Sequence, residues 1–278
     1  MTTMTITAAE INKLRQMTGA GMMDCKKALT DAGGNFEQAI DELRKKGQKV
    51  AANRSDRDAK EGIVLAGVSE DKKLGIVLAV NCETDFVAIN EDFGKFVNTI
   101  LNIAITNKAQ SADDVKKLPF DDKISVAEKL IEKTGVIGEK IELNKYEIVE
   151  ASHVIAYNHP GNRLANIVGF NSASISPDVA KDVAMQVAAM APVAVDKDDV
   201  DAEIIKREIE VGKEQAREEG KPEEMLEKIA LGKLNKFYKE STLLNQAFIK
   251  DNKKTIAQYL SDSEKGLTVT GFKRIALS

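Results

Sequence analysis

The chain has no tryptophan and few other aromatic side chains. Its 278 residues include four Tyr and nine Phe, so that aromatics make up only 5% of the sequence. A hydrophobic core must therefore be built mainly from Val, Ile, Leu and Ala. The composition, with 43% hydrophobic and 30% charged residues, is that of a globular protein, and the length predicts roughly two domains.

Cysteine and histidine are equally scarce. Cys25 and Cys82 lie 57 positions apart and belong to no CxxC pair or Cys/His cluster, which excludes a zinc site of that kind. We interpret both as buried free thiols. His153 lies within a predicted strand and His159 in a Pro-Gly loop, so the first is interpreted as structural and the second as an exposed contact residue.

Phosphate-binding and catalytic motifs are also missing. The pattern GxxxxGK[ST] does not occur, and Gly19-Ala20-Gly21 lacks the preceding strand that a nucleotide fingerprint requires. Acidic residues are abundant, but their order pairs no two of them in a recognisable pocket. We therefore expect a binding protein that is not an enzyme and that carries no cofactor and no metal.

Long apolar runs and targeting signals are absent as well. Runs such as Ile76–Val80 fall far short of the ~20 residues needed to cross a bilayer. The first residues, MTTMTITAAE, contain neither a basic nor an apolar segment, so we expect no signal peptide. Sparse cysteine fits a reducing cytoplasm, and we expect no membrane partner. A net charge of −4 and a pI near 5.5 argue against nucleic acid as a partner.

Residues 1–46 predict a compact module of three helices. Thr7 and Glu10 form a capping-box pattern at the start of the first helix. The second helix, Met22–Ala32, ends at Gly33-Gly34, because glycine accommodates the left-handed conformation that follows a helix. The third begins at Asn35, and we expect Gly47 to end it. Modules of this size are too small for a catalytic cleft, so we expect this one to dock on a partner.

A basic stretch follows the third predicted helix. Residues 44–60 contain only Asp56 and Asp58 as acidic side chains, against Arg44, Lys45, Lys46, Lys49, Arg54, Arg57 and Lys60. Because the stretch has no apolar periodicity, we interpret 47–61 as a mobile linker. Contact with RNA or with an acidic partner is the alternative interpretation.

The rest of the chain predicts an α+β fold. In 62–139, strands at Ile63–Val68 and Leu74–Val80 form a hairpin signature, and helices are expected at about 91–106 and 123–133. Further strands are expected at about 140–150, 152–158 and Leu164–Phe170, with a helix beginning at Pro177. A helix near 254–260 and a strand at Thr268–Leu277 end the chain. Because strands, a polar loop and a helix recur, we interpret 62–139 as one α+β subdomain and 140–195 with 241–278 as a related one.

Residues 196–240 interrupt the second subdomain with highly charged sequence. Two helices with narrow apolar stripes are separated by Gly220-Lys221-Pro222, and the stretch carries 14 acidic against 10 basic side chains. This pattern is typical of an antiparallel helical hairpin. Whether the hairpin packs only on itself or supports a partner or a dimer contact stays open.

The segment Thr84-Asp85-Phe86-Val87 is the most unusual one in the chain. Phe86 follows the end of a predicted strand and stands among polar residues. Its side chain either covers the core beneath the next helix or serves as an exposed anchor for a partner, and spacing does not distinguish the two.

Two motifs resemble signatures of a known family. The first, TGAGMMDCKKAL at Thr18–Leu29, is similar to the N-terminal signature of bacterial elongation factor Ts, and NCETDFV at Asn81–Val87 is similar to the second signature. Their order and separation, and the predicted layout of nearly the whole chain, agree with that family.

The resemblance implies guanine-nucleotide exchange on the translational GTPase elongation factor Tu, in its GDP-bound and nucleotide-free states. Met22, Met23 and Lys26 would dock on the GTPase domain. Thr84, Asp85, Phe86 and Val87 would form the loop that dislodges Mg²⁺, with Asp85 and Phe86 pressing between helices. His159 would approach another domain and help distort the phosphate site. The resemblance leaves open a homodimer or a heterotetramer with the GTPase.

Two other classes of function compete with this one. An RNA-associated protein would use the basic stretch 44–60, and its binding would fall steeply with salt. A structural adaptor would dock through the three-helix module and dimerise through the hairpin, without changing nucleotide release.

Overall fold

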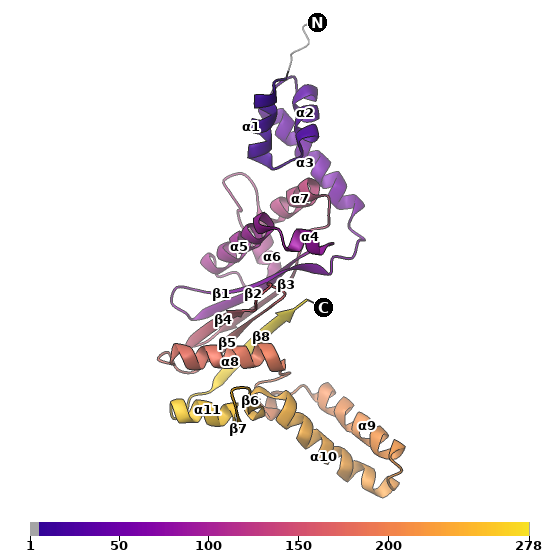
Figure 1. Cartoon of the computed structure of the whole chain (residues 1–278), viewed down its shortest axis with the longest axis vertical. Helices are drawn as coiled ribbons and strands as arrows, with labels where there is room; N and C mark the ends of the chain where they lie inside the picture. Colours follow the sequence, from indigo (N-terminus) through magenta and orange to yellow (C-terminus); the bar gives the residue numbers. More distant parts are fainter. Residues whose placement is uncertain (1–5, 278) are drawn as a thin grey trace. The chain divides into compact units, whose positions relative to one another are not determined.

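The computed structural model describes residues 6–277 and confirms a mixed α+β chain (Figure 1). The helices are α1 (Ala8–Thr18), α2 (Met22–Asp31), α3 (Phe36–Asn53), α4 (Asp85–Ala88), α5 (Glu91–Thr106), α6 (Ala112–Lys117), α7 (Val126–Ile137), α8 (Pro177–Met190), α9 (Ala202–Glu218), α10 (Glu223–Ser241) and α11 (Ile256–Ser263). The strands are β1 (Glu61–Val68), β2 (Leu74–Cys82), β3 (Glu142–Glu150), β4 (His153–Asn158), β5 (Leu164–Phe170), β6 (Ala247–Phe248), β7 (Asp251–Thr255) and β8 (Val269–Ala276). Within 6–277, no helix is both long and apolar enough to span a membrane.

Contacts divide the chain into two compact units. Among the described residues, unit 1 comprises 6–63, 78–146 and 277, and unit 2 comprises 64–77 and 147–276. The predicted boundaries of the subdomains stay a prediction. Unit 1 contains the three-helix module together with α4 to α7, and unit 2 contains α8 to α11.

The three N-terminal helices begin where their start signals predict, and the first two also end near their predicted glycines. Thr7 and Glu10 make the reciprocal capping box of α1, and Gly19 ends that helix in the left-handed conformation with φ 71°. The three helices enclose a small core. Its fully buried members include Leu14, Cys25 and Leu29. The few apolar residues of this segment are therefore gathered in one core, which holds the three helices together.

The prediction that Gly47 ends the third helix is wrong. Helix α3 continues to Asn53, so the first seven residues of the predicted linker 47–61 are helical and only 54–60 connect the helix to β1. Gly47 is buried where α3 crosses α7. A Cβ atom built on Gly135 of α7 would overlap Gly47 Cα, and one on Gly47 would lie 3.6 Å from the Ile131 carbonyl oxygen. The two glycines therefore allow the backbones of two helices to touch.

The strands form two three-stranded sheets and one small pair. The first sheet has the order β1-β2-β3, and every residue of β2 is buried, which accounts for its unbroken apolar run. In the second sheet β5 lies between β4 and β8 and is antiparallel to both. Helix α8 packs against β5 through a cluster that includes Val168, Phe170, Val183 and Val187. The short pair β6–β7 was not predicted.

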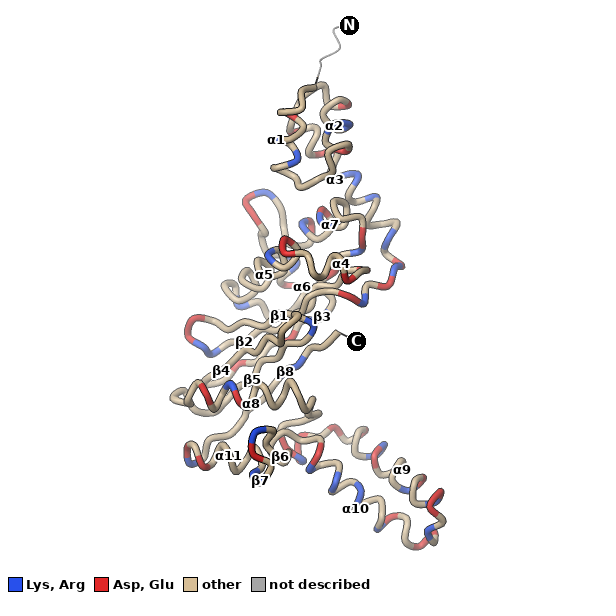
Figure 2. The backbone as a smooth tube through the Cα atoms, in the orientation of Figure 1, with Lys and Arg blue, Asp and Glu red and all other residues tan. Residues whose placement is uncertain are grey.

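Helices α9 and α10 lie side by side and form the predicted antiparallel hairpin (Figure 1). Their contact is close, because a Cβ atom at Gly212 would lie 3.1 Å from Ala230 Cα. The buried stripe is narrow and consists of Gly212, Ala216, Leu226, Ala230 and Leu234. Figure 2 shows acidic and basic residues along both helices, as their sequence predicts.

We predict opposite effects for alanine at two helical glycines. Gly135→Ala should lower the free energy of unfolding by about 1–3 kcal/mol, because the added methyl group overlaps the α3 backbone. Gly232→Ala should raise it by about 0.5–1 kcal/mol, since alanine is the better helix former. No neighbouring atom lies within 4 Å of a Cβ built on Gly232. Urea unfolding followed by circular dichroism measures both, and equal stability of the two variants would contradict the close helix contact.

Candidate functional site

The segment predicted as a loop is a single helical turn. Thr84 is extended, with φ −123° and ψ 154°, and α4 follows immediately at Asp85. Backbone hydrogen bonds close the turn, from Ala88 N–H to the Thr84 oxygen at 3.3 Å and from Ile89 N–H to the Asp85 oxygen at 2.9 Å. Asn90 then caps α5 by accepting from Asp92 and Phe93 N–H. The chain therefore leaves β2, makes one helical turn and enters the long helix α5, with only short connecting segments on either side of the turn.

This turn carries its largest apolar side chains on the outside. The exposed fraction of Phe86 is 78%, which excludes the interpretation that this ring covers the core. Ile89 is 80% exposed and lies three positions later, on the same side of the helical turn. Asp85 is also exposed, whereas Val87 is half-buried. Two large apolar side chains exposed next to each other are typical of a surface that binds a partner.

A carboxylate distant in sequence holds the base of the turn. Glu139 Oε2 accepts from the backbone N–H of Glu83 at 3.1 Å and of Thr84 at 3.0 Å, and Oε1 accepts from the Thr84 hydroxyl at 2.7 Å. From the other side, the Cys82 thiol donates to the Thr84 carbonyl oxygen at 3.1 Å. Burial, together with the carboxylates of Glu139 and Glu61, raises the pKa of Cys82 to about 12, so the thiol keeps the proton that it donates.

The neighbouring Glu83 forms a second, reciprocal link. Its carboxylate accepts from the Lys140 backbone N–H at 2.7 Å and lies 2.7 and 2.8 Å from Nη1 of Arg54. Burial alone would raise the pKa of Glu83, but the Lys140 N–H and the Arg54 guanidinium together hold it below its ordinary value. Arg54 directly follows α3, so the end of that helix is tied to the residue that precedes Thr84.

Sequence reasoning did not find these supporting residues. Glu139 and Thr84 are 55 positions apart, and Arg54 and Glu83 are 29 apart. Neither pair belongs to a shared periodic pattern. Ile89 was also missed, although an apolar residue between Ala88 and Asn90, just before a capped helix, is a signal that could have indicated it.

The other predicted contact residues are exposed as well. Met22 and Met23 are 51% and 74% exposed at the start of α2, and Lys26 is exposed one turn later. These three residues belong to unit 1, as does the turn at Asp85–Ala88. His159 belongs to unit 2 and is exposed between β4 and β5, where its ring Nδ1 lies 3.1 Å from the Tyr157 hydroxyl.

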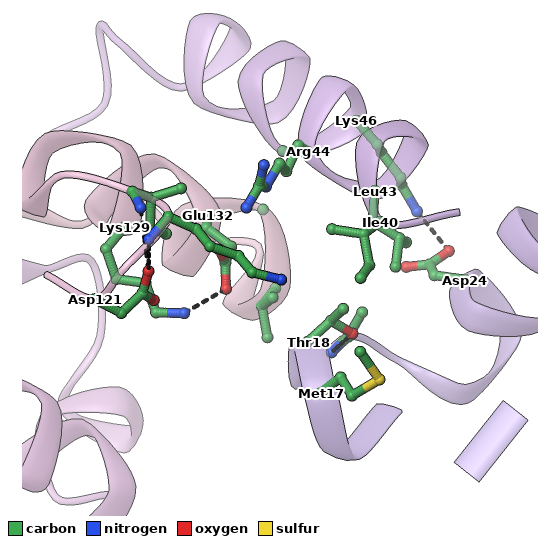
Figure 3. A pocket seen from close by; sticks show the side chains of 16 residues that line it. Met17, Thr18, Asp24, Ile40, Leu43, Arg44, Lys46, Asp121, Lys129 and Glu132 are labelled. Atoms are coloured by element: carbon green, nitrogen blue, oxygen red, sulfur yellow. Dashed lines mark hydrogen bonds and ion pairs between the residues drawn. The ribbon is translucent and has the colours of Figure 1, made fainter. Parts of the chain in front are cut away.

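A pocket in unit 1 is lined by other residues than these predicted contacts. It has a volume of about 150 Å³ and is lined by residues of the three-helix module and of 121–136 (Figure 3). Ligand pockets usually measure about 300–1,000 Å³. Its charges are largely compensated, because Lys46 pairs with Asp24 at 2.5 Å and Lys129 with Glu132 at 2.7 Å. Across residues 6–277, no group of three or more His, Cys, Asp or Glu side chains could hold a metal ion.

Comparison with known proteins gives a consistent result over the whole chain. A family model described as elongation factor TS matches residues 83–278. The elongation factor Ts of Cytophaga hutchinsonii is 54% identical over 276 residues, which cover 99% of both chains. That of Flavobacterium psychrophilum is 50% identical over 98% of this chain and 99% of its own. That of Chloroherpeton thalassium is 44% identical over 95% and 94%.

The matches to the relatives include the segment from Asn81 to Val87 and extend over both compact units, whereas the family model covers this segment from Glu83 onward. The similarity to the two signatures is therefore part of a likeness that spans the chain. This protein belongs to the elongation factor Ts family.

Proposed function

We propose that the protein is the guanine-nucleotide exchange factor for elongation factor Tu and acts without covalent chemistry, so that it is not an enzyme in the bond-making sense. The observation that carries the proposal is the exposed pair Asp85 and Phe86, held on a supported turn in a member of this family. An exposed ring on a fixed backbone can press into a partner, because little conformational entropy is lost when it binds.

The proposed action is displacement of Mg²⁺ from the nucleotide site. Magnesium bridges phosphate and protein and offsets charge repulsion there, so its loss weakens GDP binding. The exchange factor must then bind the nucleotide-free GTPase more tightly than the GDP-bound form. Linkage requires the reverse effect too, so rebinding of nucleotide expels the factor. Phe86 supplies the apolar bulk for this action, and Asp85 supplies a hydrogen-bonding group.

Three contacts divide the work in this proposal. Met22, Met23 and Lys26 dock on the GTPase domain, the turn at Asp85–Ala88 acts on the magnesium site, and His159 approaches another domain and helps distort the phosphate site. We interpret 62–139, with β1, β2 and α5, as one α+β subdomain, and 140–195 with 241–278, with β4, β5 and α8, as a related one, since each has two strands followed by a helix. With this partner, the protein would act in the cytoplasm. It would form a complex with the GTPase, either as a homodimer or as part of a heterotetramer.

The decisive experiment is stopped-flow release of a fluorescent GDP from the cognate elongation factor Tu, with and without this protein. We expect strong acceleration that saturates with concentration. A stable complex without acceleration would contradict exchange and leave the adaptor interpretation, whereas binding to RNA that falls steeply with salt would favour the RNA interpretation.

Replacing Phe86 should separate function from stability. Phe86→Ala removes a hot-spot side chain, so we expect the maximal release rate to fall by about 30-fold, whereas the free energy of unfolding should change by less than about 0.5 kcal/mol. Stopped-flow release and thermal unfolding measure the two effects. Leu231→Ala, which truncates a side chain that is 47% exposed on α10, is the control and should change neither. A large loss of stability with normal release would contradict the role of Phe86 as a wedge.

The two methionines of the docking module should act differently from Phe86. Met22→Ala and Met23→Ala together should raise the half-saturating concentration by about 10-fold and leave the maximal rate nearly unchanged, because docking contributes equally before and during release. A concentration series of the stopped-flow experiment separates the two quantities. Met225→Ala on α10, where the side chain is 45% exposed, is the matched control. A lower maximal rate with normal half-saturation would assign the methionines to the displacement step.

A further inference from the structure

We propose that Glu139 is a positioning residue for nucleotide exchange, because it fixes the backbone of Glu83 and Thr84 and so sets the direction in which Phe86 projects. This inference rests on the proposed function. Glu139 lies in the loop between α7 and β3, outside the exposed turn, and hydrogen bonds join it to the base of α4.

The segments 83–84 and 139–140 bind each other reciprocally. The Glu139 carboxylate accepts two backbone N–H groups and one hydroxyl from residues 83 and 84, and the Glu83 carboxylate accepts the N–H of Lys140. All four donor–acceptor distances lie between 2.7 and 3.1 Å. Hydrogen bonds to an ionised acceptor are roughly twice as strong as neutral ones, so these four bonds should hold the two segments together strongly.

Glu139 itself stands on a rigid support. Helix α7 ends at Gly138, which adopts the left-handed conformation with φ 80° and donates its N–H to the Thr134 oxygen at 2.8 Å. The buried Thr134 hydroxyl accepts the N–H of Ile141 at 3.1 Å, just before β3 begins. Glu139 therefore lies between Gly138 and Ile141, whose backbones are both hydrogen-bonded to Thr134. These bonds restrain Glu139, and its side chain in turn restrains Thr84.

The turn has little means of holding its own orientation. Helix α4 is four residues long, and a helix this short is unstable alone because its nucleation cost is not offset by further turns. Thr84 occupies the N-cap position, yet its hydroxyl donates to Glu139 and does not accept from the helix. The exposed fraction of Phe86 is 78%, so packing contributes little to the direction of its ring. That direction is therefore set largely by the hydrogen bonds at the base of the turn.

The test compares variants of Glu139 in the full-length protein by stopped-flow GDP release. Glu139→Ala should lower the maximal rate by about 10-fold and change the half-saturating concentration by less than about 3-fold, because two backbone donors lose a charged acceptor. Glu139→Gln should restore most of the rate, since one amide oxygen can accept both N–H groups while the amide NH₂ donates to the Thr84 hydroxyl. Glu142→Ala is the control: it removes a carboxylate that pairs with Lys140 Nζ at 3.2 Å, and should have no effect.

A double-mutant cycle with Phe86 decides whether Glu139 acts through the turn. In the Phe86→Ala background, Glu139→Ala should lower the rate by less than about 2-fold further, because residues that act through one element are not additive. A full additional loss would show an independent role and overturn the inference, as would a normal rate in Glu139→Ala. Should Glu139→Ala fail to fold, Glu139→Asp, which withdraws the carboxylate by one methylene group, tests the same expectation.

A measurement on the isolated protein separates this inference from the proposed function. Hydrogen exchange of the Glu83 and Thr84 amides should become at least about 10-fold faster in Glu139→Ala and stay unchanged in Glu142→Ala. If the wild-type protein failed to accelerate GDP release while this difference was observed, the proposed function would be wrong and the positioning of the turn would still hold. Unchanged amide exchange in Glu139→Ala would overturn the positioning role itself.

Discussion

The contact of α3 with α7 at Gly47 and Gly135 is the constraint on which the arrangement of unit 1 depends. It brings the three-helix module against the helix that ends at Gly138. Glu139 follows at once and holds Thr84, from which the turn with Phe86 begins. Helix α7 thus connects the three-helix module with the support of the exposed turn. Close backbone contact suits this role, because packed interiors deform little and so preserve position.

Much of the fold could be predicted, because local patterns decide it. The apolar stripe of α5 and the mostly apolar sequence of β5 predict elements whose observed bounds agree with those expected. The capping box of Thr7 and Glu10 likewise predicts the start of α1, and Pro177 marks the start of α8. The end of α3 could not be predicted in this way. A glycine inside a helix and one after it look alike in sequence, and only the position of Gly135 in space shows that Gly47 is a packing residue.

The candidate site was predictable in its exposed part and not in its support. An isolated Phe86 after a strand indicates either core or contact, and only its exposure excludes the core. The supporting carboxylate of Glu139 gives no local signal, since its partners are backbone amides of a distant segment. Backbone groups are the same at every position, so no pattern of residue types reveals which of them a side chain will bind.

The separation of exposed from supporting residues has an energetic consequence. Phe86 and Ile89 bury little surface, so replacing them costs little stability, and in the proposed function it affects mainly the contact with the partner. Glu139 and Glu83 satisfy backbone donors, and their loss would leave those groups without partners in a half-buried position. The hydrogen bonds at the base of the turn therefore contribute mainly to folding, whereas in the proposed function the exposed tip contributes mainly to binding. The base of the turn can fix the direction of an exposed ring that gains little from packing of its own.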